Sequence, residues 1–202
     1  MTPRRWAVLA AGLLGCAHGS APPPAATPSA DSAPAARMAE SARYFPLAVG
    51  NRWTYEATYL GEKSTRRVEV VAFRDGSYVD RDGRALRADK EGIRDQVRYL
   101  LHEPLTAGAT WTSVVAPGSA EHYRVLSVRT PCQVPAGRFT DCVEVESRTL
   151  ADPATPARLL VNRVTFAAGV GIVQVRTALE EGTRSAPTAE LLLTAFEVAA
   201  AR

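Results

Sequence analysis

The sequence has few of the residues from which catalytic and metal sites are built. Its 202 residues include three cysteines and three histidines, with no Cys-x-x-Cys pair and no His-Glu-x-x-His motif. His102 and His122 do not define a zinc ligand set without spaced cysteines. A Gly-x-Ser-x-Gly elbow, a phosphate-binding loop and a dinucleotide fingerprint are also missing. We therefore predict a protein that is not an enzyme and has no catalytic residues, no metal and no cofactor.

The net charge of the chain is small. The chain has 24 Lys plus Arg against 21 Asp plus Glu, a formal net charge of +3, and no basic run longer than Arg66-Arg67. Binding to a nucleic-acid backbone needs a dense cationic surface that releases many counterions. We therefore do not expect nucleic acid as a partner.

Long hydrophobic runs are missing too. The apolar stretch from Trp6 to Leu14 is about half of the roughly 20 residues that span a bilayer as a helix. It follows Arg4 and Arg5 and leads into small residues before Cys16, which is the three-part build of an export signal. The pattern predicts export rather than a transmembrane anchor.

The ending Leu13-Leu14-Gly15-Cys16 resembles the lipobox of bacterial lipoproteins. This resemblance implies that residues 1–15 are a signal peptide and that Cys16 is acylated after cleavage. Two or three acyl chains would hold the protein firmly to a membrane. Ala17 does not resemble the Asp that retains lipoproteins in the inner membrane, so the resemblance favours the outer membrane, with the protein facing the periplasm or the cell surface. An ordinary secretory signal with an incidental cysteine is the alternative.

Residues 16–43 are predicted to be a lipidated cysteine followed by a disordered linker. Residues 17–43 are mostly Ala, Pro and Ser, without aromatic or branched aliphatic side chains, and cannot bury a core. The composition changes at Tyr44, and residues 44–202 are enough for a single domain. The prolines favour an extended spacer between membrane and domain.

The domain has the pattern of a β protein. Residues 52–60 alternate apolar and polar side chains, and residues 68–70, 143–146 and 172–175 do the same. Turn-forming pairs such as Asp82-Gly83 stand between such stretches. We predict a mainly β fold, an antiparallel meander that forms a barrel, a half-barrel or a sandwich. Residues 93–101 and 188–201 also fit a helix, and a strand is preferred for the first.

A nine-residue sequence occurs twice. Residues 46–54 read PLAVGNRWT and residues 104–112 read PLTAGATWT, identical at five positions with an offset of 58. Duplication of a β unit and convergent use of one good turn both explain the repeat. In either case we predict that Trp53 and Trp111 lead strands into the core.

These segments, together with PAGRFTDCVEV and FAAGVGIVQV, resemble a group of uncharacterised bacterial envelope lipoproteins. The resemblance covers most of residues 44–198 and supports the β fold. It implies no catalytic residue, because the shared motifs are turns and core positions.

Cys132 and Cys142 are candidates for a disulfide in an oxidising compartment. A hairpin centred on Gly137 would place them opposite each other. Strict alternation opposes this pairing, because Val143 and Val145 should face the core and leave Cys142 outside. Pro131 or a bulge would reset the register.

Two functions fit these observations. The first is a non-catalytic envelope lipoprotein whose β domain binds or scaffolds another envelope protein. The alternative is a carrier of lipid or another apolar ligand. A carrier should have an unfilled apolar cavity, whereas a scaffold should have a filled interior and an exposed patch.

The lipobox resemblance generates a direct test. Cys16→Ser removes the sulfur that would be acylated, so the chain should accumulate as an unprocessed precursor without acyl groups. Mass analysis of the protein from membrane and soluble fractions measures both effects. Normal processing and unchanged membrane partitioning of the variant would contradict the lipoprotein prediction.

Overall fold

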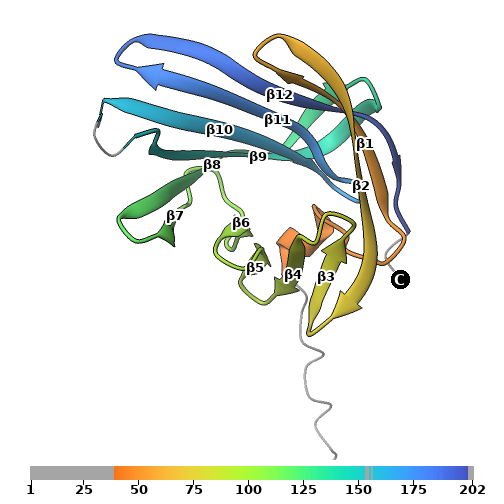
Figure 1. Cartoon of the computed structure of the whole chain (residues 1–202). Coiled ribbons are helices and arrows are strands. Elements are labelled where there is room, and N and C mark those ends of the chain that lie inside the picture. The colour runs from red at the N-terminus through yellow and green to blue at the C-terminus, as the bar shows by residue number, and fades with distance from the viewer. Residues whose placement is uncertain (1–38, 153–154, 156, 200–202) are drawn as a thin grey trace, which may run out of the picture. The chain divides into compact units, whose positions relative to one another are not determined.

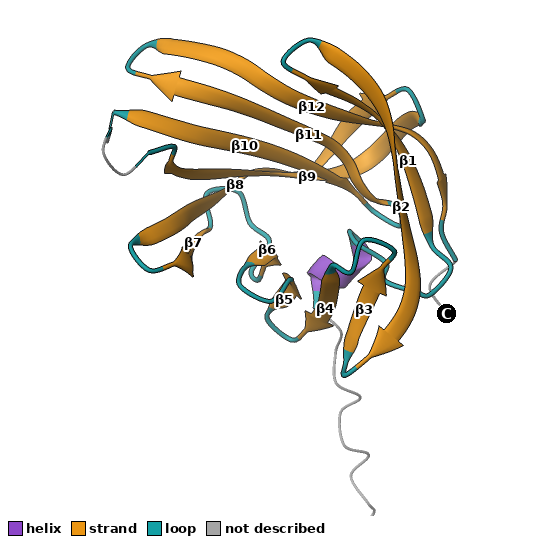
Figure 2. Cartoon of the chain, in the orientation of Figure 1, coloured by secondary structure: helices purple, strands orange, loops and turns teal. Residues whose placement is uncertain are grey.

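The computed structural model describes residues 39–152, 155 and 157–199. The predicted signal peptide 1–15, Cys16 and the linker as far as residue 38 lie outside the described residues. Within the described part, one short 3-10 helix and twelve strands form a nearly all-β domain (Figures 1 and 2). The elements are η1 (Glu40–Arg43), β1 (Arg52–Tyr59), β2 (Glu62–Arg74), β3 (Ser77–Asp80), β4 (Ala85–Asp89), β5 (Gly92–Arg94), β6 (Tyr99–His102), β7 (Thr110–Ala116), β8 (Ser119–Val134), β9 (Gly137–Leu150), β10 (Arg158–Ala167), β11 (Gly171–Glu181) and β12 (Arg184–Glu197).

The strands form one antiparallel sheet that curls into a nearly closed barrel. Its order is β6-β5-β4-β3-β2-β1-β12-β11-β10-β9-β8-β7, so each strand pairs with its neighbour in the chain and β12 returns to β1. Among the described strands, no ladder joins β6 to β7, and these two form the edges of the sheet. The predicted antiparallel meander is confirmed, and of the three forms considered the structure adopts the barrel, with one open seam.

The two copies of the repeated sequence make the same turn. Gly50 and Gly108 have φ values of 93° and 89°, a conformation that favours glycine at the third position of a type II turn. Gly50 N–H donates to the Val70 carbonyl at 2.8 Å, and Gly108 N–H donates to the Val125 carbonyl at 2.8 Å. The repeats begin β1 and β7, so the barrel consists of two six-strand meanders that each start with this turn.

Both repeated tryptophans bond to a carbonyl of another strand or turn. The Nε1–H of Trp53 donates to the Val170 carbonyl at 2.7 Å, and that of Trp111 donates to the Tyr99 carbonyl at 3.0 Å. Trp53 is 2% exposed and lies in the core, as predicted. Trp111 is half-buried and lies at the open seam, packed against the core from its edge. The predicted core position is therefore confirmed for Trp53 and only partly correct for Trp111.

The core occupies the inner face of the longer strands. Trp53 and Tyr55 alternate inward from β1, and Tyr55 lies opposite Leu193 of β12, which is fully buried. Burying each such side chain stabilises the fold by roughly 2–3 kcal/mol. The buried hydrophobic set is completed by Tyr44, Phe45, Val70, Ile93, Leu101, Leu105, Tyr123, Val125, Val134, Cys142, Val143, Val145, Phe166, Ala167, Val170 and Val173.

Both segments with ambiguous patterns are strands. Residues 92–94 and 99–102 form β5 and β6, so strand rather than helix is correct, but the single strand predicted over residues 93–101 is wrong because residues 95–98 form a turn between the two. Residues 184–197 form β12, which is paired on both sides, with β1 and with β11. The ladders on both edges outweigh the helix propensity of the alanines in this segment.

The folded part begins before the boundary predicted at Tyr44. Residues 40–43 form η1, in which Ser41 is fully buried and its N–H donates to a Glu103 carboxylate oxygen at 2.7 Å. The Tyr44 hydroxyl donates to Asp141 at 2.7 Å. The predicted disordered linker therefore does not extend to residue 43. Residues 40–43 are ordered by polar contacts, such as the one between Ser41 and Glu103.

Cys132 and Cys142 are joined by a disulfide across the β8–β9 hairpin, with their Cα atoms 6.1 Å apart. A register shift between Thr130 and Cys132 places Thr130 opposite Cys142. Cys132 lies opposite Phe139, so the disulfide does not join directly opposite residues. Cys142 and Val143 are both buried although alternation places consecutive side chains on opposite faces.

Close packing at Gly92 allows a test of the short strands. A Cβ at Gly92 would lie 2.0 Å from the Leu101 carbonyl oxygen, whereas at Gly182 it would meet nothing within 4 Å. Gly92→Ala should lower the free energy of unfolding by about 3 kcal/mol or more because backbone must move. Gly182→Ala, also at positive φ, should cost about 1 kcal/mol. Urea denaturation of both variants compares them, and equal losses would contradict the close approach.

Candidate functional site: the barrel lumen

The barrel contains an open pocket of about 780 Å³ that side chains do not fill. One wall comes from long strands β1, β2, β11 and β12, and the other from short strands β3–β6 and their turns, which lie across from them in Figure 1. The apolar lining consists of Phe45, Trp53, Tyr55, Val68, Ala85, Leu86, Val97, Leu100, Ile172, Val175 and Leu191. Alternation on β1 and β2 directs Trp53, Tyr55 and Val68 inward, whereas Phe45 and Val97 come from a loop and a turn.

The N-terminal segment closes one end of the cavity. Phe45 follows η1 and packs edge-on against Trp53, with ring centroids 5.8 Å apart, and against Phe166 at 6.2 Å. Gly171 lets these rings approach, because a Cβ there would lie 2.9 Å from the Phe45 ring. Aromatic packing therefore blocks this end.

Charged side chains also line the pocket, most of them from two turns of the short strands. Successive turns of a meander alternate between its two ends, so the β3–β4 turn (residues 81–84) and the β5–β6 turn (residues 95–98) lie at the same end. Glu103, which binds Ser41 of η1, follows β6 at the other end. The charged lining, hereafter the rim, consists of Arg66, Asp80, Arg84, Asp95 and Arg98.

Arg98 is the most strongly held cation of the rim. Its guanidinium donates to Asp95 at 3.0 Å and to Glu121 at 2.7 Å. Burial acts to lower the pKa of Arg98, but the hydrogen bonds from Asp95 and Glu121 outweigh it and raise the pKa above its ordinary value. Arg98 is therefore a fixed structural charge with both carboxylates already engaged.

The same arginine helps to close the seam between β6 and β7. Glu121, on β8, also accepts a hydrogen bond from the Tyr123 hydroxyl. Burial, with Glu121 beside it, raises the pKa of Tyr123 well above its usual range, so the phenol stays neutral. The Trp111 ring stacks on Tyr123 at 5.0 Å and on His102 at 5.8 Å. Side chains join the two edges where backbone ladders do not.

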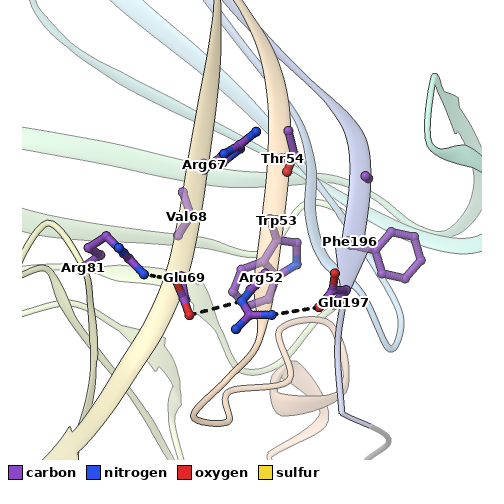
Figure 3. Close-up of a pocket in the computed structure, with 10 residues that line it drawn as sticks. Arg52, Trp53, Thr54, Arg67, Val68, Glu69, Arg81, Phe196 and Glu197 are labelled. Atoms are coloured by element: carbon purple, nitrogen blue, oxygen red, sulfur yellow. Dashed lines mark hydrogen bonds and ion pairs between the residues drawn. The ribbon is translucent and has the colours of Figure 1, made fainter.

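A second, smaller pocket of about 560 Å³ lies over β12, β1 and β2 (Figure 3). Arg52 donates to Glu69 and to Glu197, each at 3.1 Å, and Arg81 also binds Glu69. Hydrogen bonds from Arg81 and Arg52 lower the pKa of Glu69. Most of the charges here neutralise one another across three strands, so the pocket is a weaker candidate than the lumen.

The cysteines and histidines of the domain that were singled out from the sequence lie away from the lumen. Cys132 and Cys142 link the β8–β9 hairpin, and neither lines the cavity. His102 lies in the aromatic stack of the seam, while His122 is exposed and contacts the Thr112 hydroxyl at 3.1 Å. Within the residues that the structure describes, no three His, Cys, Asp or Glu side chains gather as a metal site.

Sequence reasoning did not identify the rim. Arg66 alternates inward with Val68 on β2, which a strand pattern reveals only once the inner face is known. Arg84 directly follows the Asp82-Gly83 turn, which the structure confirms through the Gly83 N–H bond to the Asp80 carbonyl at 3.0 Å.

No helix in the described ranges combines the length and apolarity needed to cross a bilayer.

Two solved structures are similar to this fold. One is an inferred exported protein of Bacteroides fragilis with a YmcC-like fold, 12% identical with a TM-score of 0.47; the match covers 76% of this chain and 98% of that one. The other is an inferred lipoprotein of Parabacteroides distasonis, 12% identical with a TM-score of 0.43 and the same coverage. No protein-family model and no curated protein matches the chain. The two likenesses are too distant to transfer a function.

The charge bridge at the seam can be measured by a double-mutant cycle. Arg98→Met and Glu121→Gln should each lower the free energy of unfolding by about 2 kcal/mol, because the first leaves the buried Glu121 without its cation and the second removes one of the two carboxylates that hold Arg98. The double variant should lose less than the sum, with a coupling of about 1 kcal/mol. The exposed pair Arg158–Glu181 is the control and should couple by less than about 0.5 kcal/mol. Equal coupling in the two pairs would contradict a stabilising role at the seam.

Proposed function

We propose that this protein is a non-catalytic, membrane-tethered lipoprotein of the bacterial cell envelope whose barrel binds an apolar ligand in its lumen. The observation that carries the proposal is the unfilled cavity of about 780 Å³ with its mainly aromatic and aliphatic lining. Of the two functions that the sequence left open, this favours the carrier, because a scaffold would be expected to have a filled interior.

The dimensions and chemistry of the cavity support a small ligand. Its volume falls within the roughly 300–1,000 Å³ of small-molecule sites. Apolar side chains around it would remove hydrocarbon from water, at about 25 cal/mol per Å² of apolar surface. Most hydrogen-bonding groups of the large aromatic side chains are already used, since Trp53 and Tyr55 donate to the Val170 and Ile172 carbonyls.

The proposed location rests on the sequence. Acylation at Cys16 would anchor the chain, and the proline-rich segment behind it would act as a spacer that rises about 3.1 Å per residue where extended. Ala17 favours the outer membrane. A lipid-binding barrel held near a membrane by such a tether would exchange its ligand over short distances.

A scaffold for another envelope protein is the second candidate. Several strand ends present exposed apolar side chains: Tyr59 is 65% exposed, Leu60 is 68% exposed and Val114 is 71% exposed. These residues lie at or near the β1–β2 and β7–β8 turns. A partner protein bound to this surface would contact their exposed apolar side chains and would need no cavity.

Filling the lumen tests the carrier function. Val175 is half-buried on β11 and lines the cavity, so Val175→Trp should occupy ligand space. Val114→Trp adds the same volume at an exposed position and is the control. We expect native mass spectrometry with lipid extraction, on protein purified from the envelope, to find at least tenfold less ligand on the first variant. Thermal unfolding checks that both variants fold. An empty unmodified protein would contradict the carrier and favour the scaffold.

A further inference from the structure

The turn between β1 and β2 carries a residue that its backbone conformation disfavours. Tyr59 pairs with Glu62, which leaves Leu60-Gly61 as a two-residue turn with φ values of 50° and 92°. Positive φ at both central residues marks a type I′ turn, in which Asn-Gly and Asp-Gly are preferred. The β2–β3 turn follows that preference, because Asp75-Gly76 occupies it with φ values of 50° and 73°. A leucine in the equivalent place costs backbone free energy, so the turn itself gives no reason for this side chain.

Burial does not offset that cost. Leu60 is 68% exposed and its neighbour Tyr59 is 65% exposed. The turn is nevertheless held in place, because the Leu60 N–H donates to the Thr188 carbonyl of β12 at 2.9 Å. Within the described part of the chain, no hydrogen bond reaches the Tyr59 hydroxyl. Two adjacent apolar side chains, hereafter the tip, are therefore presented to the surroundings from an ordered turn.

We propose that the tip, Tyr59 and Leu60, docks on a lipid bilayer. Leu60 enters the membrane interface, and the Tyr59 ring lies at the level of the head groups, where amphipathic aromatic side chains are enriched. Glu62 follows the turn directly, so the insertion is shallow. The inference rests on the membrane tether of the proposed function and adds the surface through which the barrel contacts the membrane.

The small size of the tip favours a bilayer over a protein partner. A stable protein interface buries about 800 Å² on each side, and two side chains on a two-residue turn expose only part of that area. A bilayer instead accepts single side chains, each of which gains free energy as its apolar surface leaves water. An acyl tether would keep the tip at a high local concentration near the membrane, so a weak contact would be occupied.

The predicted tether is long enough to let this end of the barrel face the membrane. The described chain begins beside η1, and Phe45 behind it packs on Trp53 at the start of β1, whereas the tip lies at the end of β1. The 8 residues of β1 span about 26 Å at about 3.3 Å per residue. Residues 17–38 would reach about 70 Å if extended at about 3.1 Å per residue.

The inner face of β1 leads from the tip to the lumen. Alternate side chains of a strand share a face, so Tyr55, Ala57 and Tyr59 lie in one row. Tyr55 lines the pocket, and Ala57 lies opposite Leu191, which lines it too. This row carries no charge, so a bilayer docked at the tip would meet an apolar ligand along an uncharged strand face.

Exposed rings at the other end of the long strands differ from the tip in having partners. Phe73, near the end of β2, packs against Tyr78 with ring centroids 4.7 Å apart. Phe196, near the end of β12, lies 6.1 Å from the ring of Phe139. These contacts account for part of their apolar surface within the fold.

The experiment places one reporter at each end of β1. The full lipoprotein, purified from the envelope with its acyl groups, is reconstituted into vesicles of phosphatidylethanolamine and phosphatidylglycerol that contain nitroxide-labelled phosphatidylcholine. Because Cys132 and Cys142 form a disulfide and Cys16 would be acylated, Tyr59→Cys supplies the single thiol for a nitrobenzoxadiazole reporter. Val49→Cys carries the same reporter as the control, since Val49 is 53% exposed and precedes β1 at its other end. A further variant combines Tyr59→Cys with Leu60→Asn.

The nitroxide lipid should quench the reporter of Tyr59→Cys and leave that of Val49→Cys unquenched. Adding Leu60→Asn should lower the ratio of docked to undocked protein about tenfold, which corresponds to the burial of part of one leucine side chain. Since Asn-Gly suits a type I′ turn, Leu60→Asn should also raise the unfolding temperature. Thermal unfolding of the variant therefore shows that lost quenching does not come from lost folding.

Equal quenching of the two reporters, or quenching that Leu60→Asn leaves unchanged, would overturn the membrane contact. Shielding of the Tyr59→Cys reporter in envelope membranes that keep their proteins, without quenching in pure lipid vesicles, would also overturn it and indicate a protein partner. Release of the purified protein from the vesicles would overturn the lipid-tethered function together with the contact. Quenching in a protein that yields no ligand on lipid extraction would support the contact and overturn the carrier alone.

Discussion

The pairing of β12 with β1 is the constraint on which the rest of the structure depends. Among the described strands, every other ladder joins consecutive strands and forms locally, whereas this one joins Arg52–Tyr59 to the end of the chain. It converts two six-strand meanders into one curved sheet. Because the two halves join through β1 and β12, the edge strands of the sheet are β6 and β7, which lie in the middle of the chain. The lumen is formed by the curling of this sheet.

Side chains complete the barrel at two places that backbone ladders leave open, the seam between β6 and β7 and the end near Phe45. At the seam, Arg98, Glu121 and the stacked ring of Trp111 connect strands that do not pair. At the closed end, Phe45 packs into the barrel after η1 and removes one exit from the cavity. The rim charges and the aromatic rings line the same pocket, so a ligand bound as proposed would contact both.

Local patterns identified much of the fold but little of the site. The alternation around Trp53 and Tyr55 predicted an inward-facing strand, and both side chains are buried. Alternation misplaced Cys142, which is buried and joined to Cys132 by the disulfide although its neighbour Val143 is buried as well. Arg84 and Arg98 read as ordinary charged turn residues, since a sequence does not show that two turns 14 positions apart border one opening.

The sequence by itself determined the strands, the turns that join them and the repeated motif that starts each half, because these depend on side-chain alternation and on backbone conformations that neighbouring residues set. It also carries the lipobox-like segment, which is read from consecutive residues. Only the tertiary structure decided that the meander closes through β1 and β12, that an interior space stays unfilled, and that charged side chains from two turns help to line it. Those features arise from contacts between distant segments, whose geometry depends on the packing of the whole sheet.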